Sequence, residues 1–201
     1  MKIITAFDNK KATQALNFLA LKEGGLIDKL KVVKLMWLAD RLHIRKYGRP
    51  IFNDIYFAMP YGAVGSSAKD LAGFNVDGDE KEYLENYLEL GRGYKIKSKQ
   101  KVDLDIFSDS EIEALEKSYR EYGQLNQFDL AELSHKFPEW EKFREVLTSK
   151  SSTRELMDYD DFFKNPSKDE GFKNIFNESA EILKTSEEAF SENIKVASYW
   201  F

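Results

Sequence analysis

The chain has 201 residues, of which 42% are hydrophobic and 14% aromatic, enough for one domain of ordinary size with a buried core. Because it contains no cysteine and only two histidines, His43 and His135, disulfide frameworks, thiolate zinc sites, cysteine nucleophiles and three-histidine metal sites are excluded. No segment has the roughly 20 apolar residues of a membrane span, and residues 1–10 lack the apolar core of a signal peptide. We therefore expect a cytoplasmic protein with no membrane contact.

The net charge of −5 is unevenly distributed along the chain. Residues 1–50 contain 11 Lys/Arg and 4 Asp/Glu, a local charge of +7, and the remainder has a charge of −12. Either the basic part forms a surface for an acidic partner or nucleic acid, or the two oppositely charged parts attract each other within one globule. The charge pattern leaves both interpretations open.

Helical signals dominate the first third of the chain. Asp8 is a predicted N-cap for a helix with apolar residues at helical spacing, and glycines from Gly24 end it. A second helix is predicted over residues 28–47, because Asp28 can cap it and Gly48 and Pro50 follow its last turn.

A small β element is predicted next. A short strand is expected over residues 55–59, and helices are expected after Ser66 and over 79–90. Residues 94–107 alternate with period two in places, which predicts a strand or hairpin that could pair with the strand near Phe57.

The remaining chain again has helical patterns. Ser108 and Glu111 match a capping box ahead of a helix that Gly123 ends. Further helices are predicted over 126–136, from Pro138 to Leu147, and, beyond a linker at 148–153, over 172–190. The expected fold class is mainly α (α+β), a helical domain over 1–147 with a small antiparallel β element and a helical C-terminal extension, 148–201, packed on it.

The second helix has two distinct faces on a helical wheel. Lys31, Lys34, Arg41 and Arg45 fall on one arc, interrupted only by Leu38. This arc is either a partner-binding face or an ordinary solvated face.

Asp40 falls in the middle of the opposite, apolar arc. A buried carboxylate must be hydrogen-bonded, paired or protonated, and the available partners are Arg49, Tyr61, His43 and the backbone N–H groups of a nearby turn. A catalytic role would need a second poised group and a pocket, and the sequence shows neither. We therefore interpret Asp40 as a structural clasp rather than as a catalytic acid.

The segment YGAVGSS, residues 61–67, could be a phosphate-binding turn or a bend that joins two elements. It lacks the lysine of a G-x-x-x-x-G-K-[ST] loop and does not match G-x-G-x-x-G. The chain also lacks the G-x-S-x-G and S-x-x-K nucleophile motifs, and His135 is interpreted as a packing residue. We expect no catalytic residue, no cofactor, no metal site and no enzyme activity.

The segment VVKLMWLADRLHIRKYGRPIFNDIYFAMPYGAVGSSAKDL, residues 32–71, resembles the Panacea domain of SocA-type antitoxins. A second block, LEKSYREYGQLNQFDLAELSHKFPEW, resembles a later part of that domain, with Gly123, Leu133, His135 and Trp140 at matching places. Ala63 stands where the family commonly has Pro, and Trp37 replaces a common Tyr. The matching residues of the first block are Lys34, Leu35, Leu38, Ala39, Asp40, Gly48, Pro50, Tyr56, Ala58, Tyr61, Gly62 and Val64.

The resemblance implies a bacterial or phage-associated antitoxin that binds and neutralises a cognate toxin protein encoded beside it. An alternative is an adaptor that delivers the toxin to a protease, as the SocA type does. A nucleic-acid-binding regulator is the third hypothesis, and the sequence pI of about 5.3 argues against it. The identity of the toxin and the oligomeric state are left open.

Two groups of site residues follow. The basic arc and the acidic, aromatic extension are the candidate partner contacts. We further expect Tyr61 and Gly62 to turn the chain from the strand into the next helix, held by Asp40. The residues assigned to the structural motif are Asp40, Gly48, Pro50, Tyr61, Gly62, His135 and Trp140.

Overall fold

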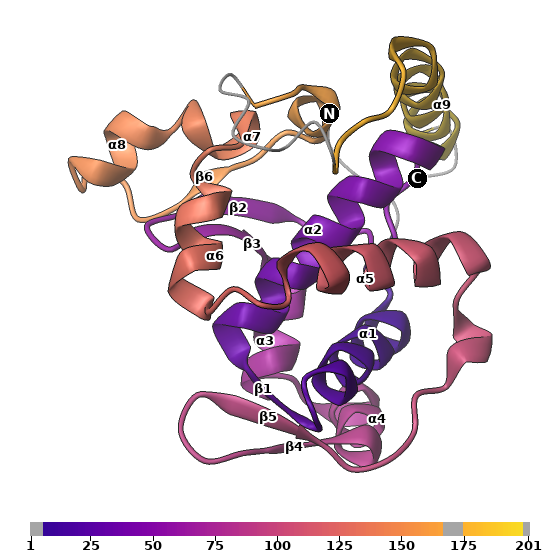
Figure 1. Cartoon of the computed structure of the whole chain (residues 1–201), viewed down its shortest axis with the longest axis vertical. Coiled ribbons are helices and arrows are strands. Elements are labelled where there is room, and N and C mark those ends of the chain that lie inside the picture. Colours follow the sequence, from indigo (N-terminus) through magenta and orange to yellow (C-terminus); the bar gives the residue numbers. More distant parts are fainter. Residues whose placement is uncertain (1–5, 167–174, 199–201) are drawn as a thin grey trace.

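The computed structural model describes residues 6–166 and 175–198 and shows helices joined by short strands and two 3₁₀ turns (Figure 1). The α-helices are α1 (Asn9–Lys22), α2 (Lys29–Tyr47), α3 (Ser66–Gly73), α4 (Gly78–Tyr87), α5 (Asp109–Tyr122), α6 (Gln127–Ser134), α7 (Pro138–Glu141), α8 (Arg144–Thr148) and α9 (Ala180–Ser198). The strands and 3₁₀ turns are β1 (Leu26–Asp28), β2 (Tyr56–Met59), β3 (Gly62–Gly65), β4 (Leu88–Leu90), β5 (Lys95–Ser98), β6 (Glu155–Leu156), η1 (Leu104–Ile106) and η2 (Tyr159–Phe163). The expected mainly α fold with small antiparallel β elements is confirmed.

The described strands form two separate antiparallel sheets of three strands, in the orders β1-β5-β4 and β3-β2-β6. The β2–β3 hairpin pairs Phe57 with Val64 and turns at Pro60 and Tyr61, and β6 adds to the other edge of β2. The predicted pairing of the 94–107 segment with the strand near Phe57 is wrong. Strand β5 pairs instead with β1 and β4, because the tight turn before it brings β4 alongside and the chain after α1 supplies β1.

The predicted capping residues begin and end the helices as expected. The Asp28 carboxylate accepts hydrogen bonds from the backbone of the first turn of α2, and Gly48 ends the helix in the left-handed conformation at φ 66°. Asp8 accepts from the N–H of Lys11 at the start of α1. Ser108 and Glu111 form the capping box of α5, and Pro138 occupies the first turn of α7.

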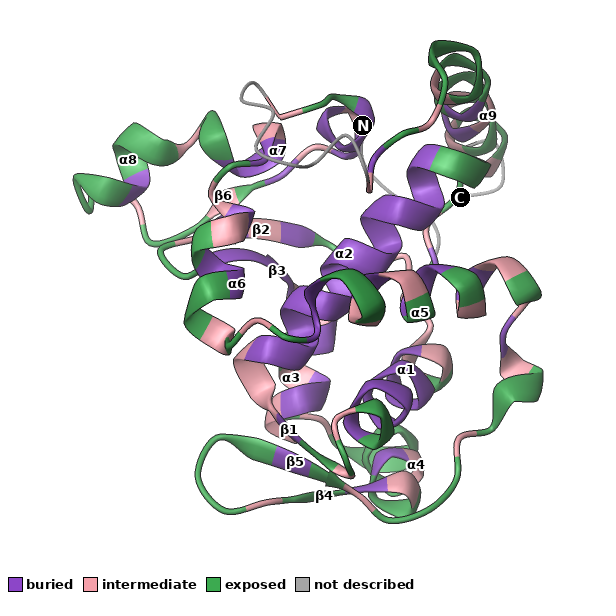
Figure 2. Ribbon diagram, in the orientation of Figure 1, coloured by how far each residue is buried: buried purple, intermediate pink, exposed green. Residues whose placement is uncertain are grey.

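Helix α2 crosses the middle of the molecule and is buried on every side over residues 31–45 (Figure 2). Helices α1, α5, α6 and α9 pack around it, as do the β2–β3 hairpin and η2. The sheet β1-β5-β4 lies at one end of the molecule and α9 at the other (Figure 1). The solvated basic face that the helical wheel allowed does not exist in this fold, because other elements cover both faces of α2.

The chain after residue 147 joins the same buried cluster as the rest. Tyr159, Phe162, Phe176 and Phe190 belong to the hydrophobic core that includes Trp37. The last helix begins at residue 180 rather than near 172 as predicted; residues 172–174 lie outside the described ranges, and 175–179 are not helical. Ile175 and Phe176 therefore pack on the core from an irregular segment.

Candidate functional site

Asp40 is fully buried in the middle of α2 and joins two segments of the chain. One carboxylate oxygen accepts a hydrogen bond from the N–H of Ile51, which follows the Gly48–Pro50 turn. The other accepts from the hydroxyl of Tyr56 on β2 at 2.8 Å. A single side chain of α2 thus holds both the turn after the helix and the first strand of the hairpin.

The predicted partners of Asp40 differ from the observed ones. Tyr61 is 65% exposed and does not contact Asp40, and His43 hydrogen-bonds through Nδ1 to the carbonyl of Arg49 at 2.8 Å. Only the backbone N–H alternative matches. Burial raises the pKa of Asp40 to about 7, although the hydrogen bonds from Ile51 and Tyr56 act in the opposite direction.

Asp54 occupies the place that a bound anion would need at the start of α3. Its carboxylate accepts from the N–H groups of Ser67 and Ala68, both at 2.9 Å, and from that of Ile55 at 2.7 Å. The N–H groups of Ser67 and Ala68 belong to the first turn of α3, where a phosphate would otherwise bind. The sequence YGAVGSS therefore spans the end of the hairpin turn, strand β3 and the start of α3, where a carboxylate of the protein itself binds the helix N–H groups. The expectation that Tyr61 and Gly62 turn the strand directly into a helix is wrong, because they turn it into β3 and the helix begins only at Ser66.

The β2–β3 hairpin is anchored by groups on α2, α6 and α7. The ammonium of Lys34 donates to the carbonyl of Ala63, and the Ala63 N–H donates to Ser134 Oγ at 3.2 Å. The indole N–H of Trp140 donates to the carbonyl of Met59 at 2.9 Å, and His135 stacks on Trp140 with ring centroids 3.8 Å apart. His135 and Trp140 thus lie together beside the hairpin.

Gly62 lies at the centre of this anchoring. Its φ of +87° belongs to the left-handed region, and a Cβ there would stand 2.9 Å from Lys34 Nζ and 3.0 Å from the Ala131 carbonyl oxygen. Only a glycine permits the hairpin to turn and approach α6 at the same residue.

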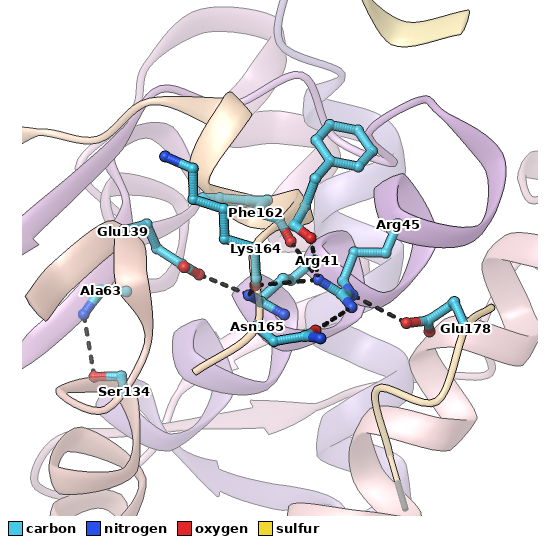
Figure 3. A network of polar contacts seen from close by, with 10 residues as sticks. Arg41, Arg45, Ala63, Ser134, Glu139, Phe162, Lys164, Asn165 and Glu178 are labelled. Atoms are coloured by element: carbon cyan, nitrogen blue, oxygen red, sulfur yellow. Dashed lines mark hydrogen bonds and ion pairs between the residues drawn. The ribbon is translucent and has the colours of Figure 1, made fainter. Parts of the chain in front are cut away.

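A buried ion pair joins α2 to α7. Arg41 Nε donates to Glu139 at 2.8 Å, and both side chains have no exposed surface (Figure 3). Arg41 Nη2 also donates to the carbonyl of Lys164 at 2.6 Å, and the guanidinium packs against the rings of Phe137 and Phe176, 4.6 Å from each centroid. Burial raises the pKa of Glu139, and the charge of Arg41 opposes that shift.

Arg45 binds the chain that follows β6. Its Nε pairs with Glu178 at 3.0 Å, and its two Nη atoms donate to the carbonyls of residues 162–164 and, at 2.7 Å, to the side chain of Asn165 (Figure 3). Burial and the neighbouring charge of Arg41 lower the pKa of Arg45 to about 10. A fork of five N–H donors is well suited to hold several carbonyls of one irregular segment.

The structure corrects the expectation that the basic arc of α2 is a contact surface. All four residues of the arc are buried, and the ammonium of Lys31 is bound to Glu23 and to the Gly123 carbonyl. The reason is that carbonyls and carboxylates from later in the chain cover each cation. Each of the four binds at least one group more than 25 residues later in sequence, which no helical wheel can show.

Sequence reasoning missed Asp54 and Glu139. Asp54 had one readable signal, because a short acidic side chain stands shortly before a turn into a helix that has no N-cap of its own. Glu139 occupies the first turn of a short helix, where acidic residues are common, so its burial against Arg41 had no local signal.

Two further properties concern the described residues. No helix over 6–166 and 175–198 is both long enough and apolar enough to span a bilayer. In the same ranges, no cluster of three or more His, Asp or Glu side chains is placed to bind a metal ion.

Comparison with protein families gives one match, over residues 32–141, to the family described as "Antitoxin SocA-like, Panacea domain". No curated protein and no solved structure matches the chain. The matched range runs from the second turn of α2 to the end of α7, so it includes Asp40, Gly62, Glu139 and the hairpin they hold. Because this range is more than half of the chain, the protein belongs to the SocA-like antitoxin family with a Panacea domain.

Proposed function

We propose that the protein is the antitoxin of a toxin–antitoxin pair and neutralises a cognate toxin protein by binding it, without catalysing a reaction. The family match over residues 32–141 carries this proposal. The geometry supports it, because the polar residues of the matched range are engaged in holding the fold. Asp40 binds Ile51 and Tyr56, and Asp54 closes the start of α3. Such a scaffold fits a binding protein whose activity lies on its surface.

Co-expression tests the proposal directly. Each open reading frame adjacent to the gene is expressed alone and then together with this chain, and growth is measured. One neighbour should arrest growth alone and be tolerated in the presence of the chain. The Asp40→Ala variant, which we expect not to accumulate as a folded protein, is the negative control and should not rescue growth. If no neighbour is toxic, or if the toxic neighbour is not rescued, the proposed function is wrong.

Degradation of the toxin is the alternative mode, because the family description names SocA, whose type acts as an adaptor for a protease. The half-life of the toxin after translation is stopped separates the two modes. Neutralisation by binding alone predicts the same half-life with and without the host protease. A toxin that becomes short-lived only when chain and protease are both present establishes the adaptor mode.

A further inference from the structure

An apolar groove of about 460 Å³ lies between the first turns of α2, the β2–β3 turn and the end of α3. We call it the hairpin groove. Its two walls come from parts of the chain about 30 residues apart, and the turn is fixed by the Lys34, Ser134 and Trp140 contacts described above. Its apolar lining includes Leu30, Val33, Met59, Pro60, Val64 and Ala72.

Two exposed tyrosines stand at the groove. Tyr61 is 65% and Tyr94 82% exposed, and both are far more solvated than other tyrosines of the fold such as Tyr56. The Tyr94 carbonyl accepts a hydrogen bond from the Lys29 N–H at 2.8 Å, so the β4–β5 turn is held against the start of α2. Aromatic side chains on a rigid frame beside an apolar floor are typical of the energetic centre of protein–protein interfaces.

The charges at the groove have one sign. Lys29, Lys34 and Lys69 line it, and no Asp or Glu is among its described lining residues. Lys69 has an exposed carboxylate neighbour, Asp70, at 3.6 Å, a separation at which a surface pair is weak. Lys34 is buried beneath Gly62 and, among the described residues, forms no ion pair with a carboxylate. Because burial lowers the pKa of Lys34 well below its usual range and its Nζ is engaged by the Ala63 carbonyl, the positive charge at the groove comes from Lys29 and Lys69 at its edge.

We propose that the hairpin groove is the toxin-docking site and receives a segment in which an apolar or aromatic side chain is flanked by carboxylates. This inference rests on the proposed antitoxin function. The apolar side chain would be buried against the floor, and the carboxylates would face Lys29 and Lys69, which gives charge complementarity across the interface. The family motif contributes Tyr61 and Gly62 to this surface, which gives the motif a binding role beside its structural one.

The groove stays open in the fold, whereas the basic arc is covered. All of its described lining residues fall between Lys29 and Tyr94, so the segment after residue 147 contributes none of them. Arg41 and Arg45 by contrast are enclosed by that segment. A partner can therefore reach the groove without displacing any segment within residues 6–166 and 175–198.

Single-stranded nucleic acid is the competing occupant, since it also pairs with lysines and stacks on tyrosines. The floor favours a protein partner. It consists of aliphatic side chains, which suit a buried apolar side chain of a protein. The chain as a whole has a net charge of −5, which repels a polyanion such as nucleic acid. Nucleic acid is therefore an outcome that the experiment has to test.

The first experiment uses peptide probes and does not need the toxin. The amide spectrum of the ¹⁵N-labelled full chain is titrated with the blocked peptide Asp-Glu-Phe-Leu-Glu-Asp, with its lysine analogue Lys-Lys-Phe-Leu-Lys-Lys, and with a thymidine decanucleotide. The acidic peptide should shift Gly62, Gly73 and Tyr94 in a saturable way, and the lysine analogue should not. Shifts elsewhere, equal shifts with both peptides, or tighter binding of the oligonucleotide at the groove would overturn the inference.

Charge reversal supplies a matched comparison. Lys69→Glu should weaken binding of the acidic peptide about three- to tenfold at low salt, and less as salt screens the charge. Lys184→Glu, the same change at an exposed lysine of α9 that also has a carboxylate neighbour, should leave the affinity unchanged. Equal affinities of the two variants would contradict the proposed role of the lysines.

The second experiment uses the toxin that the co-expression assay identifies. The double variant Tyr94→Ala/Lys69→Glu should bind the toxin at least tenfold more weakly and rescue growth poorly. The control Phe128→Ala/Lys184→Glu removes an exposed aromatic and an exposed cation outside the groove and should behave as the natural chain does. If the natural chain rescues and the groove variant rescues equally well, the toxin docks elsewhere, although the antitoxin function stands. If no neighbour is rescued by the natural chain, the proposed function fails, and the peptide titration still decides the chemistry of the groove.

Discussion

The carboxylate of Asp40 ties the Gly48–Pro50 turn and strand β2 to the centre of α2. It is enclosed completely, so each hydrogen bond it accepts satisfies a donor that water cannot reach. The cost of losing this side chain is therefore the cost of leaving the Ile51 N–H and the Tyr56 hydroxyl without an acceptor.

Replacement of Asp40 by alanine should lower the free energy of unfolding by about 2–4 kcal/mol, since two buried donors lose their partner. Asp40→Asn keeps one acceptor oxygen and should cost less. Tyr56→Phe removes only one of the two bonds and should cost about 1 kcal/mol. Urea unfolding with unchanged m-values measures all three variants. Equal losses for Ala and Asn would show that the acceptor is not what stabilises this position.

Stability should also depend on pH through Asp40. Its pKa is raised from 3.8 to about 7 in the folded chain, so between these values the folded chain keeps a proton that the unfolded chain has released. The contribution of Asp40 to the free energy of unfolding is therefore fully present below pH 3.8, falls as pH rises toward 7, and is constant above.

The difference in unfolding free energy between the natural chain and Asp40→Asn isolates this effect from other groups. It should decrease with rising pH in that window, with a slope of at most about 1.4 kcal/mol per unit. The difference between the two chains is needed because other carboxyl groups also make stability depend on pH. Burial raises the pKa of Asp54, whereas hydrogen bonds hold the pKa of Asp161 below its usual range despite its partial burial. A difference that does not change with pH would mean that Asp40 titrates at its ordinary pKa.

The Arg41–Glu139 pair predicts a non-additive mutant cycle. Glu139→Leu leaves a buried guanidinium without its carboxylate and should cost about 3–5 kcal/mol. Arg41→Met alone leaves the carboxylate unpaired and should cost a similar amount. The double variant should be much more stable than the sum of the two losses implies, because neither member of the pair is left as an unpaired buried charge. Additive losses in chemical unfolding would contradict a direct coupling of the two groups.

Among the elements, α9 packs against the end of α2 at a residue with no side chain. A Cβ on Gly48 would stand 2.5 Å from the Ser186 carbonyl oxygen and 3.1 Å from the Ala189 Cβ. The same residue has a left-handed conformation that ends α2. Gly48 thus serves both the helix terminus and the close approach of α9.

Gly48→Ala should destabilise the chain more than Gly93→Ala does. Both glycines have positive φ, 66° and 70°, so both variants carry a backbone cost of about 1–2 kcal/mol. At Gly93 a Cβ would meet nothing within 4 Å, so that variant measures the backbone cost alone. The excess at Gly48 should be accompanied by faster hydrogen exchange in α9. Equal destabilisation by the two variants would mean that α9 moves away from residue 48 without a loss of unfolding free energy.

At the scale of the whole molecule, residues before and after 147 share one core. The rings of Phe137 and Phe176 lie 5.5 Å apart at 83°, and Arg45 binds three carbonyls of residues 162–164. The basic residues 1–50 also pair with acidic residues from the rest of the chain. Lys11 pairs with Glu111, Arg41 with Glu139 and Arg45 with Glu178. The oppositely charged parts of the sequence therefore pair with each other inside one fold, as the second interpretation of the charge pattern holds.

We expect a chain shortened to residues 1–147 to lose its sharp unfolding transition. The cut removes every described partner of Arg45 and leaves Arg41 and the core aromatics facing water. Thermal unfolding followed by circular dichroism, with dye binding to exposed apolar surface, compares this chain with the full one. A shortened chain with the same transition would show that residues 1–147 are an independent domain.

Local chemistry made much of the fold predictable. Asp8, Asp28 and the Ser108–Glu111 pair started helices where expected, because a cap needs only its own first turn. Strand pairing was not predictable in the same way. The partner of β5 is β1, about 70 residues earlier, and alternation identifies a strand without identifying its neighbour.

The sequence by itself determined the helical class, the family motif, the inward position of Asp40 and the end of α2 at Gly48. These follow from spacing, capping and backbone sterics, which act within a few residues. Only the tertiary structure decided that Arg41 and Arg45 are buried and that lysines and tyrosines from separate segments surround one apolar groove. A wheel shows which residues share a face, whereas the elements that cover that face come from distant chain and are selected by packing and by pairing of buried charge.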